Sequence, residues 1–399
     1  MTSTLHGAPP PPLGALAPTT GTGNGAAGRS VPPPAIISRA LRPGIYAPVP
    51  TFFTANEELD LVSFSKHVVR LAQAGVFPVI SGSTGEAPHL TPPERTALIK
   101  AARSAFASNR LDGVPIIAGA NGSSLKHSIE LAYDAASAGA DAVIVIPSGY
   151  FAGVTNTSDG KAALREFYIE LANHSPIPIL IYNYPGASGG INMDSDFLID
   201  LAKSAPNTCG LKLTCNEIGK LLRICSVTAV PEFATSYPRK FPYIPFLVFT
   251  GYSDTLYPAL IARGAGAITG LANLVPHTVR RLFDIAVTSI NAGSTNHMIE
   301  AQALQSTVAQ ADFNLSTHGI AGIKWALSRY GADLGYDYTG GLPRKPLPPL
   351  SAGVDLQLER QLHEIIVREK ALLREREQIG ATAGVGASAG PNRSTTSLR

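Results

Sequence analysis

Short apolar runs alternate with amphipathic segments along the middle of the chain. The runs are rich in Val, Ile, Leu and Phe and have the length of strands that are buried on both faces. Strands separated by helical segments predict an α/β fold, a (β/α)8 TIM barrel. The expected strands are 44–53, 77–81, 114–119, 142–147, 177–183, 209–214, 246–251 and 266–270.

Most of these runs are followed by a segment with helical periodicity. Residues 61–75 have apolar side chains near positions i, i+3, i+4 and i+7 and end at a glycine. Residues 91–105 begin with Thr91, continue with proline, and place Glu94 three residues further on. This spacing predicts a capping box at the start of a helix. Two further helices of the same kind are expected over 123–140 and 192–205.

The alternative to a barrel is an open, doubly wound sheet. Such a sheet would place a GxGxxG turn after its first strand, but residues 50–58 read "PTFFTANEE". The nearest glycine-rich stretch, 263–270, comes late and lacks the required spacing. The pattern therefore favours the barrel.

The two ends of the chain differ in composition from the middle. Residues 1–40 are rich in Pro, Gly, Ala, Ser and Thr and contain no acidic residue, and 380–399 are also of low complexity. Both are expected to be disordered tails. The absence of acid, together with Arg29, Arg39 and the nearby Arg42, makes a mitochondrial transit peptide the alternative for 1–40. The barrel is expected over 41–290 and a helical extension over 291–379.

The extension is expected to contain three helices, at 296–312, 316–330 and 353–379. The last has an apolar stripe and a charged opposite face, so it should pack on the barrel or on a second subunit. The stripe consists of Leu358, Leu362, Ile365, Ile366 and Leu373.

Composition excludes several classes of partner. The formal net charge is +3 without a long block of one sign, which argues against a nucleic acid or a membrane surface as partner. No apolar run reaches the roughly 18 residues of a membrane span. The odd count of three cysteines is typical of a reducing compartment and favours the cytoplasm. The histidines show no metal-binding spacing, so neither a metal nor a cofactor is expected.

Polar segments follow several of the strands, at the end of the barrel where such folds have their active sites. Strand two ends in "SGSTGE" (81–86), strand four runs into "PSGYF" (147–151), and strand five ends in "YNYPG" (182–186). Strand six carries Lys212 between two leucines. These segments are the candidate site.

Lys212 and Tyr182 are expected on neighbouring strands, about 4.8 Å apart. Burial lowers the pKa of a lysine, and the free amine can then attack a carbonyl carbon to form a Schiff base. The Tyr182 hydroxyl would transfer the protons of that reaction. The alternative is that Lys212 extends to the strand end or pairs with Glu217 or Asp254.

The "GSTG" turn adds a second element of chemistry. Gly82 and Gly85 flank Ser83 and Thr84, so the backbone can come close to a ligand. Two hydroxyls and successive N–H groups can bind a carboxylate. Together with Lys212, the turn predicts a pocket for a 2-oxo acid, with its carboxylate on the loop and its carbonyl on the lysine.

On these residues the sequence resembles the dihydrodipicolinate synthase/N-acetylneuraminate lyase family. The resemblance rests on "GSTGE" at 82–86, "YNYPG" at 182–186 and "GLKLT" at 210–214, in that order and spacing. It implies a pyruvate-dependent class I aldolase on a TIM barrel with extra C-terminal helices. The substrates implied are pyruvate, or the 2-oxo acid that releases it, and an aldehyde.

The resemblance also implies roles for single residues. Lys212 resembles the lysine that forms the Schiff base, and Tyr182 the general acid and base. Ser83 and Thr84 resemble the hydroxyl pair that binds the pyruvate carboxylate and relays protons. Tyr150 is similar to a tyrosine that reaches into the neighbouring subunit's site, which implies a homo-oligomer, a dimer or a tetramer.

Two further positions, Gly251 and Ile268, resemble residues that line the pocket. One departure is informative: dihydrodipicolinate synthases have an arginine shortly after the "YN-x-P" motif, and Ala187 stands there in this sequence. The sequence therefore looks more like 4-hydroxy-2-oxoglutarate aldolases and 2-keto-3-deoxy sugar-acid aldolases. The alternatives are a synthase or dehydratase of the same family, or a barrel without catalytic activity that binds a metabolite.

Overall fold

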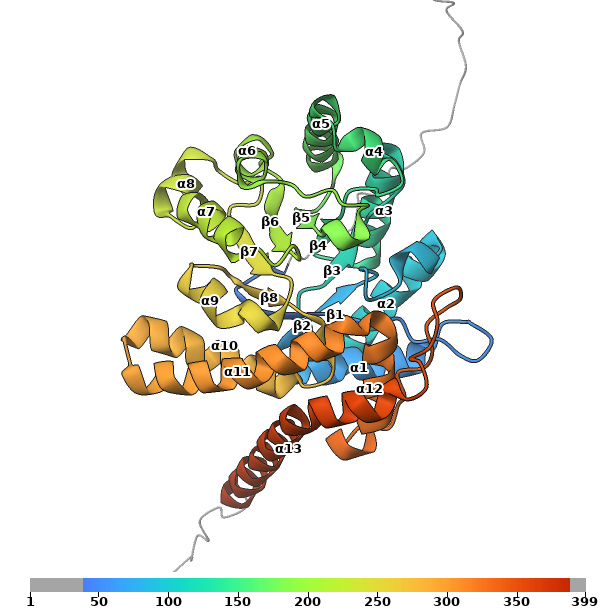
Figure 1. Cartoon of the computed structure of the whole chain (residues 1–399), viewed down its shortest axis with the longest axis vertical. Helices are drawn as coiled ribbons and strands as arrows, with labels where there is room; N and C mark the ends of the chain where they lie inside the picture. Colours follow the sequence, from blue (N-terminus) through green and yellow to red (C-terminus); the bar gives the residue numbers. More distant parts are fainter. Residues whose placement is uncertain (1–38, 388–399) are drawn as a thin grey trace, which may run out of the picture. The chain divides into compact units, whose positions relative to one another are not determined.

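The computed structural model describes residues 39–387, and within them eight parallel strands form a closed barrel in chain order (Figure 1). Strand β1 pairs with both β2 and β8, which closes the barrel. The predicted (β/α)8 fold is confirmed. The strands are β1 (Gly44–Pro48), β2 (Val76–Ile80), β3 (Ile117–Gly119), β4 (Ala142–Val145), β5 (Ile179–Asn183), β6 (Thr208–Leu213), β7 (Leu247–Thr250) and β8 (Gly266–Ile268).

Helices surround the strands and connect each to the next (Figure 1). The predicted capping box is present: the Thr91 N–H donates to Glu94 Oε2 at 2.8 Å, and Thr91 Oγ1 accepts from the Glu94 N–H at 3.4 Å. The helices up to β8 are α1 (Leu61–Gln73), α2 (Pro92–Ser108), α3 (Leu125–Ala138), α4 (Ala152–Thr155), α5 (Ser158–His174), α6 (Ser195–Ser204), α7 (Ile218–Thr228), α8 (Pro231–Ser236) and α9 (Leu256–Ile261).

Side chains fill the barrel interior. Tyr46 of β1 contacts Phe77 of β2 and Phe249 of β7, with ring centroids 5.1 Å apart in both pairs. Phe249 is the register partner of Lys212, and Lys212 is the register partner of Tyr182. Because register partners on parallel strands point to the same face, this core lies beside the lysine and gives it an apolar surrounding.

Helix α10 (Pro276–Ala292) follows β8 and is the last helix of the barrel, and three more helices follow it: α11 (Thr295–Thr317), α12 (Gly319–Tyr330) and α13 (Val354–Ala387). Helix α11 packs on α10 and α12, and α13 packs on α10 and α11 (Figure 1). The apolar stripe predicted for the last helix is buried at Leu358, Leu362, Ile365 and Ile366. It packs within this subunit, which was one of the two expected arrangements.

The end of α13 differs from the prediction. The helix continues to Ala387, whereas the low-complexity tail was expected to begin at 380. A helix that is already formed extends at little cost, because each added residue gains a hydrogen bond without a new nucleation step. The expected tails at 1–38 and 388–399 lie outside the described residues.

Helix α13 also supports the barrel through a charged residue. Glu369 is fully buried, and its carboxylate accepts hydrogen bonds from the N–H groups of His277 (3.0 Å) and Thr278 (2.7 Å). These groups belong to the first turn of α10, where backbone N–H groups lack partners within the helix. Glu369 thus caps a barrel helix from the far end of the chain. Every helix within residues 39–387 is too short or too polar to cross a bilayer.

Candidate active site

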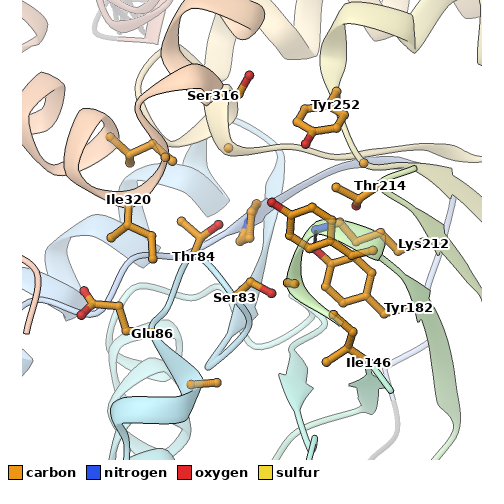
Figure 2. Close-up of a pocket in the computed structure, with 18 of the residues that line it drawn as sticks. Ser83, Thr84, Glu86, Ile146, Tyr182, Lys212, Thr214, Tyr252, Ser316 and Ile320 are labelled. Atoms are coloured by element: carbon orange, nitrogen blue, oxygen red, sulfur yellow. Dashed lines mark hydrogen bonds between the residues drawn. The ribbon is translucent and has the colours of Figure 1, made fainter. Parts of the chain in front are cut away.

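A cavity of about 450 Å³ opens at the carboxyl ends of the strands (Figure 2). Five residues predicted from the sequence line it: Ser83, Thr84, Tyr182, Lys212 and Gly251. They come from the ends of β2, β5, β6 and β7. The opposite wall is formed by helices α11 and α12, through side chains such as Ser316 and Ile320. The extension therefore contributes to the cavity.

Lys212 and Tyr182 lie against each other in this cavity. The Lys212 Nζ donates to the Tyr182 hydroxyl at 3.1 Å and lies 4.3 Å from the centre of its ring. The two residues are register partners on β5 and β6, so the predicted proximity of their strands is confirmed. This pairing brings an amine and a weak acid to hydrogen-bond distance at one point of the cavity.

The charge of Lys212 is poorly stabilised. The residue is only 5% exposed, and burial lowers the pKa of its amine to about 7. The two carboxylates considered as partners make other contacts instead: Glu217 lies 3.1 Å from Lys220 Nζ, and Asp254 accepts from Asn216 at 3.2 Å. Near neutral pH, a large fraction of Lys212 is consequently a free amine.

Tyr182 remains protonated over the same range. Burial raises the pKa of its hydroxyl to about 12, while the hydroxyls of Thr214 and Ser83 act in the opposite direction. Tyr182 also stacks on Tyr184, with ring centroids 5.6 Å apart. A protonated tyrosine beside a neutral amine can both donate and accept protons during attack on a carbonyl.

The "GSTG" turn is held in a tight conformation. Ser81 and Glu86, the residues that flank the turn, have left-handed backbones with φ of 53° and 56°. A side chain at Gly85 would place its Cβ 2.9 Å from the carbonyl oxygen of Val49, so this glycine is required. The Gly85 carbonyl accepts from Thr51 Oγ1 at 2.6 Å. These contacts fix the turn to the end of β1 and direct Ser83 and Thr84 into the cavity (Figure 2).

Gly82 has a different position from the one expected for a glycine that contacts a ligand. It is buried and is not among the residues that line the cavity. A Cβ at this position would meet only Val79, at an ordinary 3.8 Å. Gly85, also predicted to contact a ligand, does not line the cavity either; its missing side chain allows the turn to approach the backbone of Val49.

Two other predicted residues lie away from the cavity. Ile268 is fully buried in β8 and does not line the cavity, which is a correction to the prediction. The lining from this strand comes instead from Gly270 and Leu271, beyond the strand end, because the cavity lies above the last residues of the sheet. Tyr150 is 87% exposed and packs edge to face on Phe151, with ring centroids 5.0 Å apart, so it does not enter the cavity of its own chain.

Several lining residues were missed by the sequence analysis. Thr214 lies two positions after Lys212, and strand alternation could have placed it on the same face. A Cβ at Gly251 would lie 2.1 Å from Thr214 Oγ1, so Gly251 allows the ends of β6 and β7 to approach each other. The other missed polar residues are Glu86, His89, Asn121, Tyr184 and Tyr252 from the loops and Asp312 and Ser316 from α11.

Asp312 connects the extension to the strand ends. It is 2% exposed, and its carboxylate accepts from Ser253 Oγ at 2.9 Å, from the Asp254 N–H at 3.1 Å and from Thr269 Oγ1 at 3.4 Å. Burial raises its pKa to about 6. Ser253 and Asp254 follow β7, and Thr269 follows β8. Asp312 therefore positions the cavity wall that contains Gly251 and Tyr252.

Glu86 makes a similar connection on the other side. The carboxylate is 1% exposed and lies 2.7 Å from the Lys324 Nζ of α12 and 3.1 Å from His89 Nδ1. It also accepts from the Arg344 N–H at 2.8 Å. These contacts of Glu86 are those of a residue that orients the turn. Within the described residues, no group of three or more His, Cys, Asp and Glu is arranged to hold a metal ion.

Known proteins are similar to this chain in sequence. A relative from Aspergillus niger named L-threo-3-deoxy-hexylosonate aldolase is 37% identical over 343 residues, which cover 83% of this chain and 97% of the relative. A relative from Emericella nidulans, whose name describes a mitochondrial 4-hydroxy-2-oxoglutarate aldolase, is 37% identical over 336 residues, or 84% of this chain and 98% of the relative.

Solved structures give the same result. A dihydrodipicolinate synthase family protein from Coccidioides immitis superposes with a TM-score of 0.69 at 32% identity, covering 84% of this chain and 99% of that one. YagE from Escherichia coli, solved in complex with pyruvate, has a TM-score of 0.67 at 26% identity and covers 82% of this chain and 99% of that one. The sequence pattern of the Dihydrodipicolinate synthetase family matches residues 42–365. The chain therefore belongs to the dihydrodipicolinate synthetase family.

Proposed function

We propose that the protein is an aldolase that cleaves a 2-oxo acid to pyruvate and an aldehyde, or condenses the two, through a Schiff base on Lys212. The observation that carries the proposal is the buried Lys212 amine, 3.1 Å from the Tyr182 hydroxyl in a cavity lined by Ser83 and Thr84. Relatives named as aldolases of 3-deoxy-hexylosonate and 4-hydroxy-2-oxoglutarate support this reaction class. Their names also suggest the substrate, a 4-hydroxy-2-oxo acid.

The carboxylate of the substrate binds at the "GSTG" turn in this proposal. Ser83 and Thr84 supply two hydroxyl donors. The backbone hydrogen bond within the turn is donated by the Glu86 N–H, so the N–H groups of Ser83 and Thr84 are available to the ligand. Such groups stabilise an anion without a positively charged side chain. The C2 carbonyl then faces Lys212.

The chemistry follows from the free amine. Lys212 attacks C2, the carbinolamine loses water, and a protonated imine remains. A base removes the proton of the C4 hydroxyl, the C3–C4 bond breaks, and its electron pair moves through C3 and C2 to the imine nitrogen. An aldehyde leaves, the enamine takes a proton at C3, and water releases pyruvate. Tyr182 is the group that transfers the protons at the carbinolamine.

Tyr150 would act in a homo-oligomer. The side chain is 87% exposed beside the exposed Phe151. Because an exposed aromatic pair is a common anchor of subunit contacts, we propose that Tyr150 completes the site of a second copy in a dimer or tetramer. The mitochondrial designation of the Emericella nidulans relative and the acid-free sequence of residues 1–40 together support a mitochondrial location over the cytoplasmic one.

Borohydride reduction in the presence of pyruvate tests the proposal directly. We expect a stable adduct on Lys212, identified by peptide mass mapping, because borohydride reduces the imine to an amine that no longer hydrolyses. The Lys212→Arg variant keeps a positive charge but should form no adduct. Tyr182→Phe should form the adduct about 10²–10⁴ times more slowly.

Tyr133→Phe provides the matched control, since Tyr133 is an exposed tyrosine on α3 and should leave the rate unchanged. Folded wild-type protein without an adduct on Lys212 would contradict the proposed mechanism and favour the alternative of a barrel that binds a metabolite without catalysis.

A further inference from the structure

The charged groups around the cavity bear on the second substrate, the aldehyde. Apart from Lys212, the ionisable lining residues other than tyrosine are Glu86, His89 and Asp312. Among the described residues that line the cavity, Lys212 is the only lysine and none is an arginine. The amine of Lys212 would already be committed to pyruvate, since the imine forms there.

The basic side chains in and beside the lining contact carboxylates. Lys324 Nζ lies 2.7 Å from Glu86 Oε1, and the Arg344 guanidinium lies 2.7 Å from Glu94. The imidazole of His89, which lines the cavity, has its Nδ1 3.1 Å from Glu86 Oε2. Lys324 and Arg344 therefore face partners of opposite charge and are not directed at a ligand.

Negative charge is present in the cavity wall itself. Asp312 lines the cavity and is 2% exposed, with its carboxylate bound to Ser253, Asp254 and Thr269. Bound pyruvate would add its own carboxylate at Ser83 and Thr84. An aldehyde with a carboxylate would thus enter a cavity that holds like charges and, among its described lining residues, no lysine or arginine besides Lys212, which lowers its affinity.

Neutral hydroxyl and amide groups line the remaining surface. Tyr252 and Ser316 lie on one side of the cavity in Figure 2, and Tyr184 and Asn121 are also part of the lining. A tyrosine hydroxyl can both donate and accept a hydrogen bond, as can the hydroxyl of Ser316 and the amide of Asn121. Such groups suit the hydroxyls of an uncharged sugar-like aldehyde.

We propose that the cavity selects an uncharged hydroxyaldehyde and discriminates against an aldehyde that carries a carboxylate. The proposal rests on the proposed aldolase function and assigns its substrate class. It corresponds to a 2-oxo-3-deoxy sugar acid as the compound that is cleaved, and it excludes 4-hydroxy-2-oxoglutarate as the preferred one. The uncharged wall includes Ala187, which lines the cavity in the loop after β5.

Glycolaldehyde and glyoxylate form a matched pair for the test. Both have two carbons, but glycolaldehyde carries a hydroxymethyl group where glyoxylate carries a carboxylate. In condensation with pyruvate, we expect kcat/KM for glycolaldehyde to exceed that for glyoxylate by about tenfold or more, after correction for the hydrated fraction of each aldehyde. An equal or higher value for glyoxylate would overturn the proposal.

A charge variant tests the cause of the preference. Ala187→Arg places a guanidinium at the cavity wall, where it can bind a carboxylate in a bidentate manner. We expect kcat/KM for glyoxylate to rise about tenfold relative to Ala187→Gln, which adds a polar side chain without charge, while the value for glycolaldehyde does not rise. No difference between the two variants toward glyoxylate would overturn the assignment of charge as the selective factor.

Trapping of pyruvate on Lys212 in the same preparations separates the two proposals. If no adduct forms in the wild type, the aldolase mechanism itself fails. If the adduct forms but glyoxylate is the better partner, or neither aldehyde reacts, the aldolase chemistry at Lys212 stands and only the substrate assignment is wrong.

Discussion

Lys212 is the residue whose protonation should control the reaction rate. Its pKa is lowered from 10.5 to about 7 by burial, so the fraction of free amine rises as pH rises through 7. We expect the rate of adduct formation with pyruvate to increase between about pH 6 and 8 and to level off above that. Tyr182, with a pKa raised to about 12, should not contribute in this range. The measurement is the borohydride trapping rate as a function of pH.

The same pKa affects stability, with a defined sign. Lys212 binds a proton less readily in the folded protein than in the unfolded chain, so its charge destabilises the fold fully below pH 7. This cost is lost as pH rises from 7 toward 10.5, at about 1.4 kcal/mol per pKa unit. Chemical denaturation as a function of pH measures this effect, and the Lys212→Met variant should lack it.

The pH dependence of trapping can contradict the lowered pKa of Lys212. A borohydride trapping rate that keeps rising to pH 10 would mean that the amine is not desolvated.

Strand alternation made the central residues predictable from the sequence. Lys212 between two leucines, and Tyr182 at the end of the preceding strand, could be placed on one face because the side-chain period of a strand is fixed. The same rule places Thr214, two positions after Lys212, on that face. Tyr184 and Tyr252 could not be placed, since they lie in loops whose conformation depends on contacts from other parts of the chain.

At the scale of elements, the end of β7 is sensitive to a single methyl group. A Cβ at Gly251 would lie 2.1 Å from Thr214 Oγ1 and 2.6 Å from Thr214 Cα, so the ends of β6 and β7 would have to move apart. We expect Gly251→Ala to lower the free energy of unfolding by about 1–3 kcal/mol and to slow pyruvate trapping, because Lys212 is on β6. Chemical denaturation and the trapping assay measure the two effects.

Gly153→Ala is the control for this change, since no atom lies within 4 Å of the added Cβ. It should leave both measurements close to the wild-type values. Normal stability and trapping in Gly251→Ala would show that the two strand ends are not in close contact.

The sequence predicts the type of each strand or helix better than it predicts where the element ends. The first strand was expected over 44–53, but β1 ends at Pro48, and Phe53 instead forms a bridge with Leu59. The apolar pattern continues through this segment because Phe52 and Phe53 are buried in the loop above the barrel. Burial alone therefore does not distinguish a strand from a buried loop, whereas the capping box at Thr91 marked its helix correctly.

At the scale of the whole molecule, α13 holds a barrel helix in place. Glu369 supplies the carboxylate that accepts from His277 and Thr278 at the start of α10. Glu369→Ala would leave these buried donors without a partner, which should lower the free energy of unfolding by roughly 2–4 kcal/mol. Thermal or chemical denaturation would measure the loss.

Glu375→Ala, an exposed position on the same helix, should change stability by less than about 0.5 kcal/mol. If the two variants were equally stable, α13 would not cap α10 in solution.

The wall that α11 contributes was the part least accessible to sequence reasoning. Asp312 binds Ser253, which lies 59 positions earlier in the chain. A helical pattern shows which face of a helix is apolar, but not which distant loop its polar residues will meet. The strand-borne half of the cavity could therefore be predicted, and the half that comes from the extension could not.

The contacts of Asp312 and Glu86 have a consequence for the order in which the protein matures. Asp312 lies on α11 and binds Ser253 after β7, whereas Glu86 lies after β2 and contacts Lys324 on α12. Both α11 and α12 are synthesised after the barrel strands. A chain still attached to the ribosome can complete its barrel strands before α11 and α12 emerge. During that interval Lys212 would lack part of its surrounding wall, its amine would be better hydrated, and its pKa would be higher than in the complete fold. The nucleophile would thus reach its full reactivity only once synthesis is nearly finished.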